Sequence, residues 1–240
     1  MVEVNGSAEA AVLVSGGVDS AILCVDLLRE YPIIHPIYVR FGLRWEDVEL
    51  ERLRNYLSHV GKRFPGIRPL TVLEEPIAEI YGGHWSNSGK RGVPDFDTAH
   101  DAVYLPGRNL LLATKAAVWC RLREVEILAF GTLKGNPFPD SAKEFFQDLA
   151  ELLNRAMSGQ LKIIRPYERL SKTQVIARGD GLPLDLTFSC LNPSNRRHCG
   201  VCNKCEERRR AFRNVGCPDL TDYATNPAAS LQDEPHACTE

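Results

Sequence analysis

A serine- and glycine-rich turn between two apolar segments carries the residues best suited to chemistry in this sequence. After an apolar stretch ending at Val14, residues 15–20 read Ser-Gly-Gly-Val-Asp-Ser, and apolar residues at helical spacing continue to Leu28. A strand, turn and helix in this order directs unpaired backbone N–H groups and the positive end of a helix dipole toward an anion. We therefore predict an anion-binding loop made of Ser15, Gly16, Gly17, Val18, Asp19 and Ser20.

The residue types in this loop suit a phosphate ligand. Two adjacent glycines allow a phosphate to approach the backbone without interference from a Cβ atom, and the two serine hydroxyls can donate further hydrogen bonds. Asp19 carries the same sign of charge as the expected ligand. We expect it either to act through Mg²⁺ or to cap the helix.

Four of the eight cysteines lie between positions 190 and 205, and three of them are separated by two-residue spacers. Four thiolates complete a closed tetrahedral Zn²⁺ site, which would be structural. The spacing also begins some iron–sulfur motifs, and unligated thiols are a third interpretation. We predict a structural zinc that holds residues 187–190 against a helix over Glu206–Phe212. His198 is a competing ligand, but its position next to Cys199 favours a place beside the ligands or at the surface. The expected ligands are Cys190, Cys199, Cys202 and Cys205.

Composition restricts the class of protein. The 240 residues are 44% hydrophobic and carry a formal net charge of −2, which argues against a basic groove for nucleic acid. No apolar run approaches the roughly 18 residues of a membrane span, and the N-terminus has no export pattern. We expect a cytoplasmic protein without a membrane partner.

Short apolar segments alternate with helix-like segments along the first two thirds of the chain. This alternation predicts right-handed crossovers and a doubly wound, mostly parallel five-stranded α/β sheet, with ligands beyond the carboxyl ends of its strands. The expected strands are Ala10–Val14, Ile33–Val39, Ile67–Leu73, Glu126–Phe130 and Lys162–Arg165. The expected helices are Val18–Glu30, Glu46–His59, the segment from Leu105 to Arg123, Ser141–Met157 and a helix starting within Leu170–Ile176.

Single residues refine this outline. Pro36 favours an edge position or an irregularity in its strand. Asp140 is expected to cap the helix that starts at Ser141, and Ser171 or Thr173 is expected to cap the helix that follows.

We divide the chain into an α/β domain over residues 1–185, a metal-binding helical module over 186–220, and a frayed or partner-bound tail over 221–240.

Three further segments could take part in the ligand-binding site. Arg108 and Asn109 open a helix after a Pro-Gly break, and a guanidinium there could clamp a phosphate or be solvated. Lys172 could likewise reach a phosphate or face solvent. The Gly- and Ser-rich stretch Tyr81–Asp101 is either an active-site lid or an inert insertion.

The order of these motifs resembles the 7-cyano-7-deazaguanine synthase family (QueC) within the PP-loop ATP pyrophosphatases. The resemblance rests on residues 15–20, Pro106–Asn109, Leu170–Val175, Thr187–Cys190 and His198–Cys205 with Arg208. It implies an adenine nucleotide alpha hydrolase-like fold, ATP with Mg²⁺, and a homodimer. It also implies conversion of 7-carboxy-7-deazaguanine and ammonia to a nitrile through adenylated intermediates, for queuosine or archaeosine synthesis.

The resemblance also assigns residues to roles. Asp19, Arg108 and Lys172 are the expected catalytic residues. The expected ATP ligands are the loop residues 15–20 together with Arg44, Arg108 and Asn109.

Two segments depart from the family pattern. In Phe41–Trp45 the arginine is kept, but Leu43 and Trp45 stand where the family commonly has glutamine and histidine. The loop Leu133–Asp140 is shorter than usual and less acidic. Both departures concern the ligand-binding edge, so a second hypothesis is a related ligase that adenylates a different carboxylate or stops at an amide or conjugate.

Two other hypotheses are less consistent with the sequence. Another PP-loop enzyme, such as a tRNA thiolase or an amidotransferase synthetase domain, is disfavoured by the near-neutral charge and the lack of a glutaminase segment. A non-catalytic nucleotide-binding module is disfavoured because residues 15–20 and Arg108 are all present.

Overall fold

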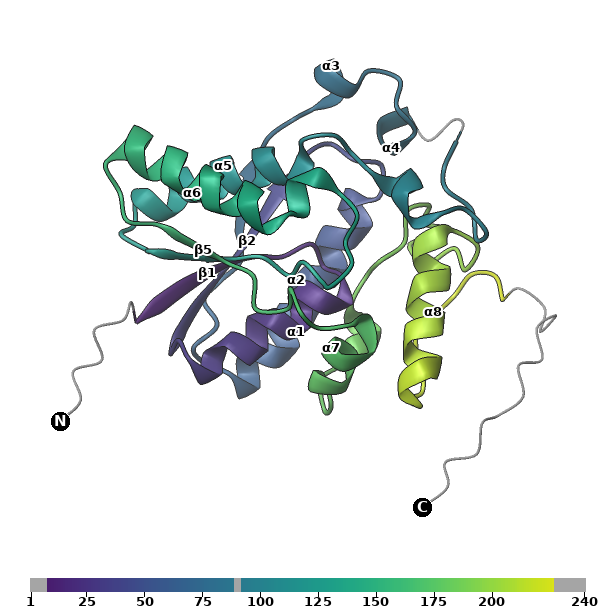
Figure 1. Cartoon of the computed structure of the whole chain (residues 1–240). Coiled ribbons are helices and arrows are strands. Elements are labelled where there is room, and N and C mark those ends of the chain that lie inside the picture. The colour runs from purple at the N-terminus through teal and green to yellow at the C-terminus, as the bar shows by residue number, and fades with distance from the viewer. Residues whose placement is uncertain (1–7, 89–91, 227–240) are drawn as a thin grey trace.

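The computed structural model describes residues 8–88 and 92–226 and contains one five-stranded sheet with helices on both faces (Figure 1). The strand order is β3-β2-β1-β4-β5, and every pairing is parallel. The strands are β1 Glu9–Leu13, β2 Ile33–Arg40, β3 Thr71–Glu74, β4 Ile127–Ala129 and β5 Lys162–Ile164. The predicted doubly wound α/β fold is therefore confirmed.

Helices connect the strands and continue beyond the last one. The α-helices are α1 Val18–Asp26, α2 Glu46–Arg63, α3 Ala78–Tyr81, α4 Trp85–Ser88, α5 Arg108–Arg121, α6 Lys143–Met157, α7 Lys172–Arg178 and α8 Asn203–Val215. Short 3-10 turns lie at Leu27–Arg29, His100–Val103, Pro139–Ser141 and Leu184–Leu186. Within the described residues, no helix is both long and apolar enough to cross a membrane.

The sheet separates two apolar cores because successive strand side chains point to opposite faces. In β1, Ala11 and Leu13 pack with residues of α5 and α6, whereas Ala10 and Val12 pack with residues of α1, α2 and α7. Figure 1 shows α5 and α6 on one side of the strands and α1, α2 and α7 on the other. The carboxyl ends of β1 and β4, which are neighbours, are left at one edge.

Pro36 does not lie on an edge strand, because β2 pairs with both β1 and β3. The predicted irregularity is present instead. Ile34 bridges Ile67, whereas three residues later Ile37 pairs with Thr71, so the facing segment contains one extra residue. This bulge lies opposite Pro36, where the proline has no N–H to donate. The strand expected to start at Ile67 consequently starts at Thr71.

Asp140 caps a different helix from the one expected. Helix α6 starts at Lys143 after Ala142 and has no side-chain cap. Asp140 Oδ2 instead accepts a hydrogen bond of 2.9 Å from the backbone N–H of Asn109, in the first turn of α5. The Asn109 side chain donates to the Asp140 carbonyl oxygen and to Ser141 Oγ. The prediction was wrong because the start of α5 packs on this loop in the folded chain. The predicted cap by Ser171 on α7 is confirmed.

The first part of the expected tail is packed rather than frayed. The backbone N–H of Thr225 donates to the Cys199 carbonyl oxygen at 3.1 Å, and the Arg209 guanidinium lies 3.9 Å from the centre of the Tyr223 ring. Gly200 is required at this contact, since a Cβ there would lie 1.8 Å from the Thr225 carbonyl oxygen. Residues 227–240 of the expected tail lie outside the described residues.

Candidate active site and metal centre

A cavity of about 570 Å³ lies beyond the carboxyl ends of β1 and β4. Of the predicted site residues, its wall contains Ser15, Asp19, Ser20, Arg108, Asn109 and Lys172. A smaller adjoining cavity of about 210 Å³ shares Ser15, Asp19, Arg108 and Lys172, and adds Gly17 and Val18. The fold therefore brings the starts of α5 and α7 to the loop that joins β1 to α1.

Two predicted ligands lie outside these walls. Gly16 is buried behind the loop. Its φ is +75° and a Cβ there would lie 3.0 Å from Glu49 Cγ, so both the backbone angle and the space require glycine. The Arg44 side chain is exposed and lines neither cavity. The Arg44 backbone N–H donates instead to the Ser86 carbonyl oxygen.

Hydrogen bonds within the loop fix its shape, and the first turn of α1 has unpaired N–H groups. Ser20 Oγ accepts a hydrogen bond of 3.1 Å from the Ser15 N–H and lies 3.2 Å from Ser15 Oγ. Gly17 precedes α1 and provides no side-chain cap, so the N–H groups of the first turn have no partner within the helix. These donors and the helix dipole suit a phosphate group.

Asp19 pairs with Lys172 rather than capping α1. Lys172 Nζ lies 2.6 Å from Asp19 Oδ2, and the other oxygen of Asp19 is buried without a hydrogen-bond partner. Burial lowers the pKa of Lys172, but the carboxylates of Asp19 and Glu207 outweigh this effect and raise the pKa above its usual value. The lysine therefore stays charged. Together the pair presents a cation and a free carboxylate oxygen beside the loop.

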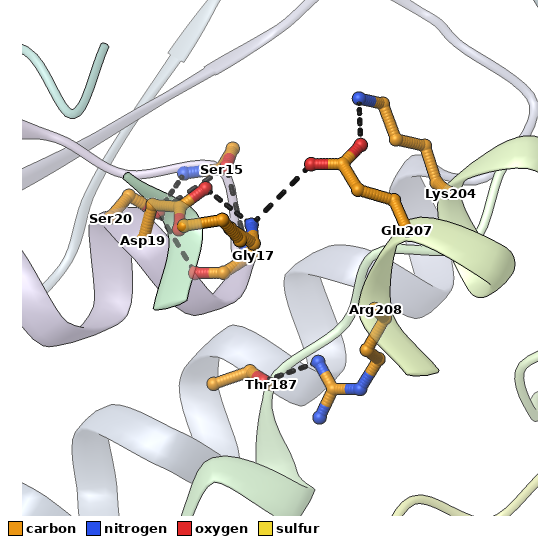
Figure 2. Close-up of polar contacts among 9 residues, drawn as sticks. Ser15, Gly17, Asp19, Ser20, Thr187, Lys204, Glu207 and Arg208 are labelled. Carbon is orange, nitrogen blue, oxygen red and sulfur yellow. Dashed lines mark hydrogen bonds and ion pairs between the residues drawn. The ribbon is translucent and has the colours of Figure 1, made fainter. Parts of the chain in front are cut away.

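Helix α8 adds charged groups that the sequence did not indicate. Lys204 Nζ lies 2.6 Å from one oxygen of Glu207, whose other oxygen lies 3.8 Å from Lys172 Nζ. Figure 2 shows Glu207 reaching from α8 toward the loop that carries Asp19. Lys204, Glu207 and Arg210 all line the larger cavity. The cysteine-rich module is thus part of the cavity wall.

Arg108 brings an unpartnered guanidinium donor to the cavity. It opens α5 after Gly107, whose φ of +73° allows the sharp entry into the helix. Arg108 Nε is buried without a partner, and the side chain lines both cavities. A buried donor without an acceptor costs about 1–3 kcal/mol, so an anionic ligand at this point would remove a cost already present in the fold.

Glu49 and Tyr38 form a buried pair in the same cavity. The Tyr38 hydroxyl donates to Glu49 Oε2 at 2.6 Å, and both residues line the larger cavity. Burial raises the pKa of Glu49 to about 8, while the bond from Tyr38 and the charge of Arg108 lower it in part. Sequence reasoning missed Glu49, although the pattern held a signal. Glu46 and Glu49 occupy the buried stripe of α2 otherwise formed by residues such as Leu53.

The four predicted metal ligands converge on one point. The sulfur atoms of Cys190, Cys199, Cys202 and Cys205 all lie within 4.8 Å of one another, and all four residues are buried. Three of the S···S distances are 3.5, 3.9 and 3.9 Å. A tetrahedral ion with bonds of about 2.3 Å needs sulfur atoms roughly 3.8 Å apart. The cluster therefore fits a metal ion.

His198 is not a member of this cluster. Its Nε2 accepts a hydrogen bond of 3.1 Å from the Ser189 N–H, and its ring packs against Phe188 and Tyr223. Burial and the nearby Arg208 charge lower the pKa of His198 to about 2, which leaves the ring neutral. The ring thus packs beside the ligands, as expected, but is buried rather than at the surface.

Both segments that depart from the family pattern border the site. Residues 133–138 and Asp140 line the larger cavity, and Trp45 lines the smaller one. Trp45 also stacks on Trp85 at 5.7 Å between ring centres, which connects it to the stretch predicted to be a lid or an insertion. That stretch also contacts the metal module, since the Asn203 N–H donates to the Pro94 carbonyl oxygen.

Comparison with known proteins agrees with these motifs. Residues 9–216 match the family model described as queuosine biosynthesis protein QueC. The chain is 30% identical to the 7-cyano-7-deazaguanine synthase of Methanothermobacter thermautotrophicus, over 89% of this chain and 98% of that protein. The synthases of Koribacter versatilis and Chlorobium phaeovibrioides are 28% and 29% identical over 93% and 91% of this chain, and over 96% and 98% of their own lengths. The chain therefore belongs to the QueC family of 7-cyano-7-deazaguanine synthases, which are ATP-using enzymes that form a C–N bond.

Proposed function

We propose that this enzyme converts 7-carboxy-7-deazaguanine, ATP and ammonia to 7-cyano-7-deazaguanine, a precursor of queuosine or archaeosine. The observation that carries the proposal is the convergence of the Ser15–Ser20 loop, Arg108 and Lys172 on one cavity. The family membership supports the choice of substrate.

The chemistry explains why these groups are needed. A carboxylate is a poor electrophile, so it must first become an acyl-adenylate that ammonia can attack. The β- and γ-phosphates leave as pyrophosphate, and the loop donors would hold them. Arg108 would neutralise the charge near the α-phosphate, where its unpartnered Nε is available. Lys172 would add a second cation at the loop. The resulting amide is adenylated in turn and loses the elements of water to give the nitrile.

Asp19 is the residue that would hold Mg²⁺. Its buried and unpartnered carboxylate oxygen faces no competing donor, and Mg²⁺ in nucleotide sites commonly takes one or two carboxylates together with phosphate oxygens. The ion would neutralise the charge of the leaving pyrophosphate. With the second oxygen bound to Lys172, the carboxylate is held in a fixed orientation.

Zinc is the metal proposed for the cysteine cluster. In a cubane iron–sulfur cluster the four cysteines bind different iron atoms, which holds the sulfur atoms further apart than the 4.8 Å spread seen here. A single ion with four thiolates fits, and with no open position its role is structural. The reduced thiols that it requires agree with a cytoplasmic enzyme.

A homodimer is also proposed, and helix α5 supplies a suitable surface. Leu110 and Val118 on α5 and Leu122 directly after it are exposed by 42, 44 and 75%, and their spacing of eight and four residues places them on the same side. Sedimentation of the purified enzyme would measure the state directly. A monomer at micromolar concentration would contradict this part of the proposal.

A second candidate reaction is favoured by the cavity wall. The segment at residues 133–138 and Trp45 both border the site, and both differ from the usual family pattern. A related ligase that adenylates another carboxylate, or that ends at the amide or a conjugate, would use the same phosphate machinery.

One incubation separates these reactions. The enzyme is mixed with ATP, Mg²⁺, ammonium and 7-carboxy-7-deazaguanine, and the products are identified by chromatography and mass spectrometry. We expect the nitrile together with AMP. Amide as the sole end product, or AMP released only with a different carboxylate, would favour the second candidate. Absence of ATP binding would contradict both.

A further inference from the structure

The larger cavity contains an acid that adenylation does not use. Glu49 is only 7% exposed, yet it lines both cavities together with Arg108. Its side chain contacts the phosphate loop directly, since the Cγ atom lies 3.0 Å from the position a Cβ would take on Gly16. Glu49 is therefore close to the place where an acyl-adenylate would form.

The second half of the proposed reaction needs a base. In neutral water ammonia is mostly ammonium, whose nitrogen has no lone pair for attack. One proton must leave before the nitrogen can bond to the carbonyl carbon. As the C–N bond forms, the C–O bond to phosphate breaks and its electron pair leaves with AMP. A second proton then leaves the nitrogen to give the neutral amide.

We propose that the Glu49 carboxylate and the Tyr38 oxygen bind ammonium in this cavity, and that Glu49 accepts the proton that frees the nitrogen for attack. The inference rests on the function proposed above. Tyr38 donates its own proton to Glu49 Oε2, so the lone pairs of the phenol oxygen remain available as acceptors. Carboxylate and phenol oxygens are therefore both available to the N–H donors of ammonium.

The surroundings of Glu49 suit this role. Three groups on three elements interact with it: the Tyr38 hydroxyl on β2, the Glu46 carboxylate on α2 and the Arg108 guanidinium on α5. Burial has the largest effect and raises the pKa of Glu49 to about 8. A carboxylate with a raised pKa is a stronger base than an exposed one, and it approaches the basicity of the amine it must deprotonate.

The test compares two half-reactions in Glu49→Gln. Carboxylate-dependent exchange of pyrophosphate into ATP, measured without ammonium, reports adenylation. Amide and nitrile formation with ammonium reports the nitrogen transfer. We expect Glu49→Gln to keep most of the exchange and to lose about a hundredfold or more in nitrogen transfer. Hydroxylamine, which is largely unprotonated at pH 7, should still give a hydroxamate at close to the wild-type rate.

A matched variant controls for the loss of a buried acid. Glu46 is the neighbouring buried acid on α2; it accepts hydrogen bonds from the backbone of Phe41 and Gly42 and lines neither cavity. Glu46→Gln should keep nitrogen transfer, even if the protein melts earlier, with a pH midpoint moved downward because the Glu46 charge raises the Glu49 pKa. Tyr38→Phe removes a hydrogen bond that lowers the Glu49 pKa, so the pH midpoint of nitrogen transfer should move upward.

The outcomes distinguish this inference from the proposed function. Undiminished nitrogen transfer in Glu49→Gln would overturn the inference while leaving the function intact. So would equal losses of exchange, amide and hydroxamate, since these would indicate a structural role. Absence of carboxylate-dependent exchange in the wild type would remove the proposed function and this inference with it.

Discussion

Arg208 joins helix α8 to segments on both sides of the cysteine cluster, and its removal tests how strongly α8 is held in place. The side chain is 2% exposed. It donates from Nε to Thr221 Oγ1 at 2.7 Å, from Nη1 to Thr187 Oγ1 at 2.8 Å, and from Nη2 to the Leu184 carbonyl oxygen at 2.7 Å. Figure 2 shows the bond to Thr187. Asp219 lies 3.9 Å away as a partial counter-charge.

The expected cost of Arg208→Met follows from these contacts. Hydrogen bonds from a charged donor contribute about 1.5–3 kcal/mol each, so three of them amount to roughly 4–9 kcal/mol. Removing the buried charge also removes its desolvation cost, which offsets part of this sum. The Leu184 carbonyl keeps the N–H and hydroxyl of Thr187 as donors, but two buried hydroxyl oxygens lose the donor that Arg208 provides. We therefore expect a net loss of about 3–5 kcal/mol in unfolding free energy. For a chain of this size the melting temperature should fall by roughly 6–20 °C.

Urea unfolding followed by circular dichroism measures this loss. Arg213→Met is the matched control, because Arg213 lies on the same helix but is exposed. The control should change the unfolding free energy by less than about 1 kcal/mol. If Arg208→Met remained within about 1 kcal/mol of the wild type, Arg208 would not be the residue that holds α8 in place.

Three further predictions concern the metal, the loop and the buried acid. Cys199→Ser should lose the bound metal and lower the melting temperature; unchanged metal content by mass spectrometry would contradict a structural site. Asp19→Ala should abolish AMP formation without unfolding the protein, because Lys172 keeps Glu207 as a partner; retained turnover would exclude Asp19 from the Mg²⁺ site. Burial raises the pKa of Glu49 from 4.5 to about 8, so between these values the folded state binds more protons than the unfolded state. Stability from this group therefore falls as pH rises through that window. Glu49→Gln should flatten the fall of the unfolding free energy between about pH 5 and pH 8, and an unchanged slope in urea titrations would refute the assignment.

Local motifs were the most predictable part of the site. The loop at residues 15–20 and the cysteines at positions 199, 202 and 205 each lie within a few residues, so their geometry depends on short-range backbone constraints. The clustered sulfur atoms agree with what was expected from spacing alone, whereas glycine at position 16 is required by its positive φ and its contact with Glu49. The α/β alternation likewise predicted the sheet, because burial on both faces leaves a clear pattern of apolar segments.

Contacts between distant segments could not be read in the same way. An edge position was one prediction for Pro36, because proline has no backbone N–H to donate. A bulge in the facing segment means that no N–H is needed at this position. Asp140 precedes a helix and looked like its cap, whereas its carboxylate reaches Asn109, 31 residues earlier. The sequence showed that Pro36 lacks a hydrogen-bond donor and that Asp140 can accept a hydrogen bond. It did not show which distant segment would lie opposite each of them.

The sequence by itself determined the serine- and glycine-rich loop at residues 15–20, the tetracysteine cluster, the parallel sheet and the family, because each depends on residue types at short and regular spacing. The tertiary structure decided which other groups reach the cavity. It brought Lys172 to Asp19, set Glu207 and Lys204 beside them, and buried Glu49 against Gly16. The physical reason is that charge pairing and burial depend on distances across the fold, which connect residues more than a hundred positions apart.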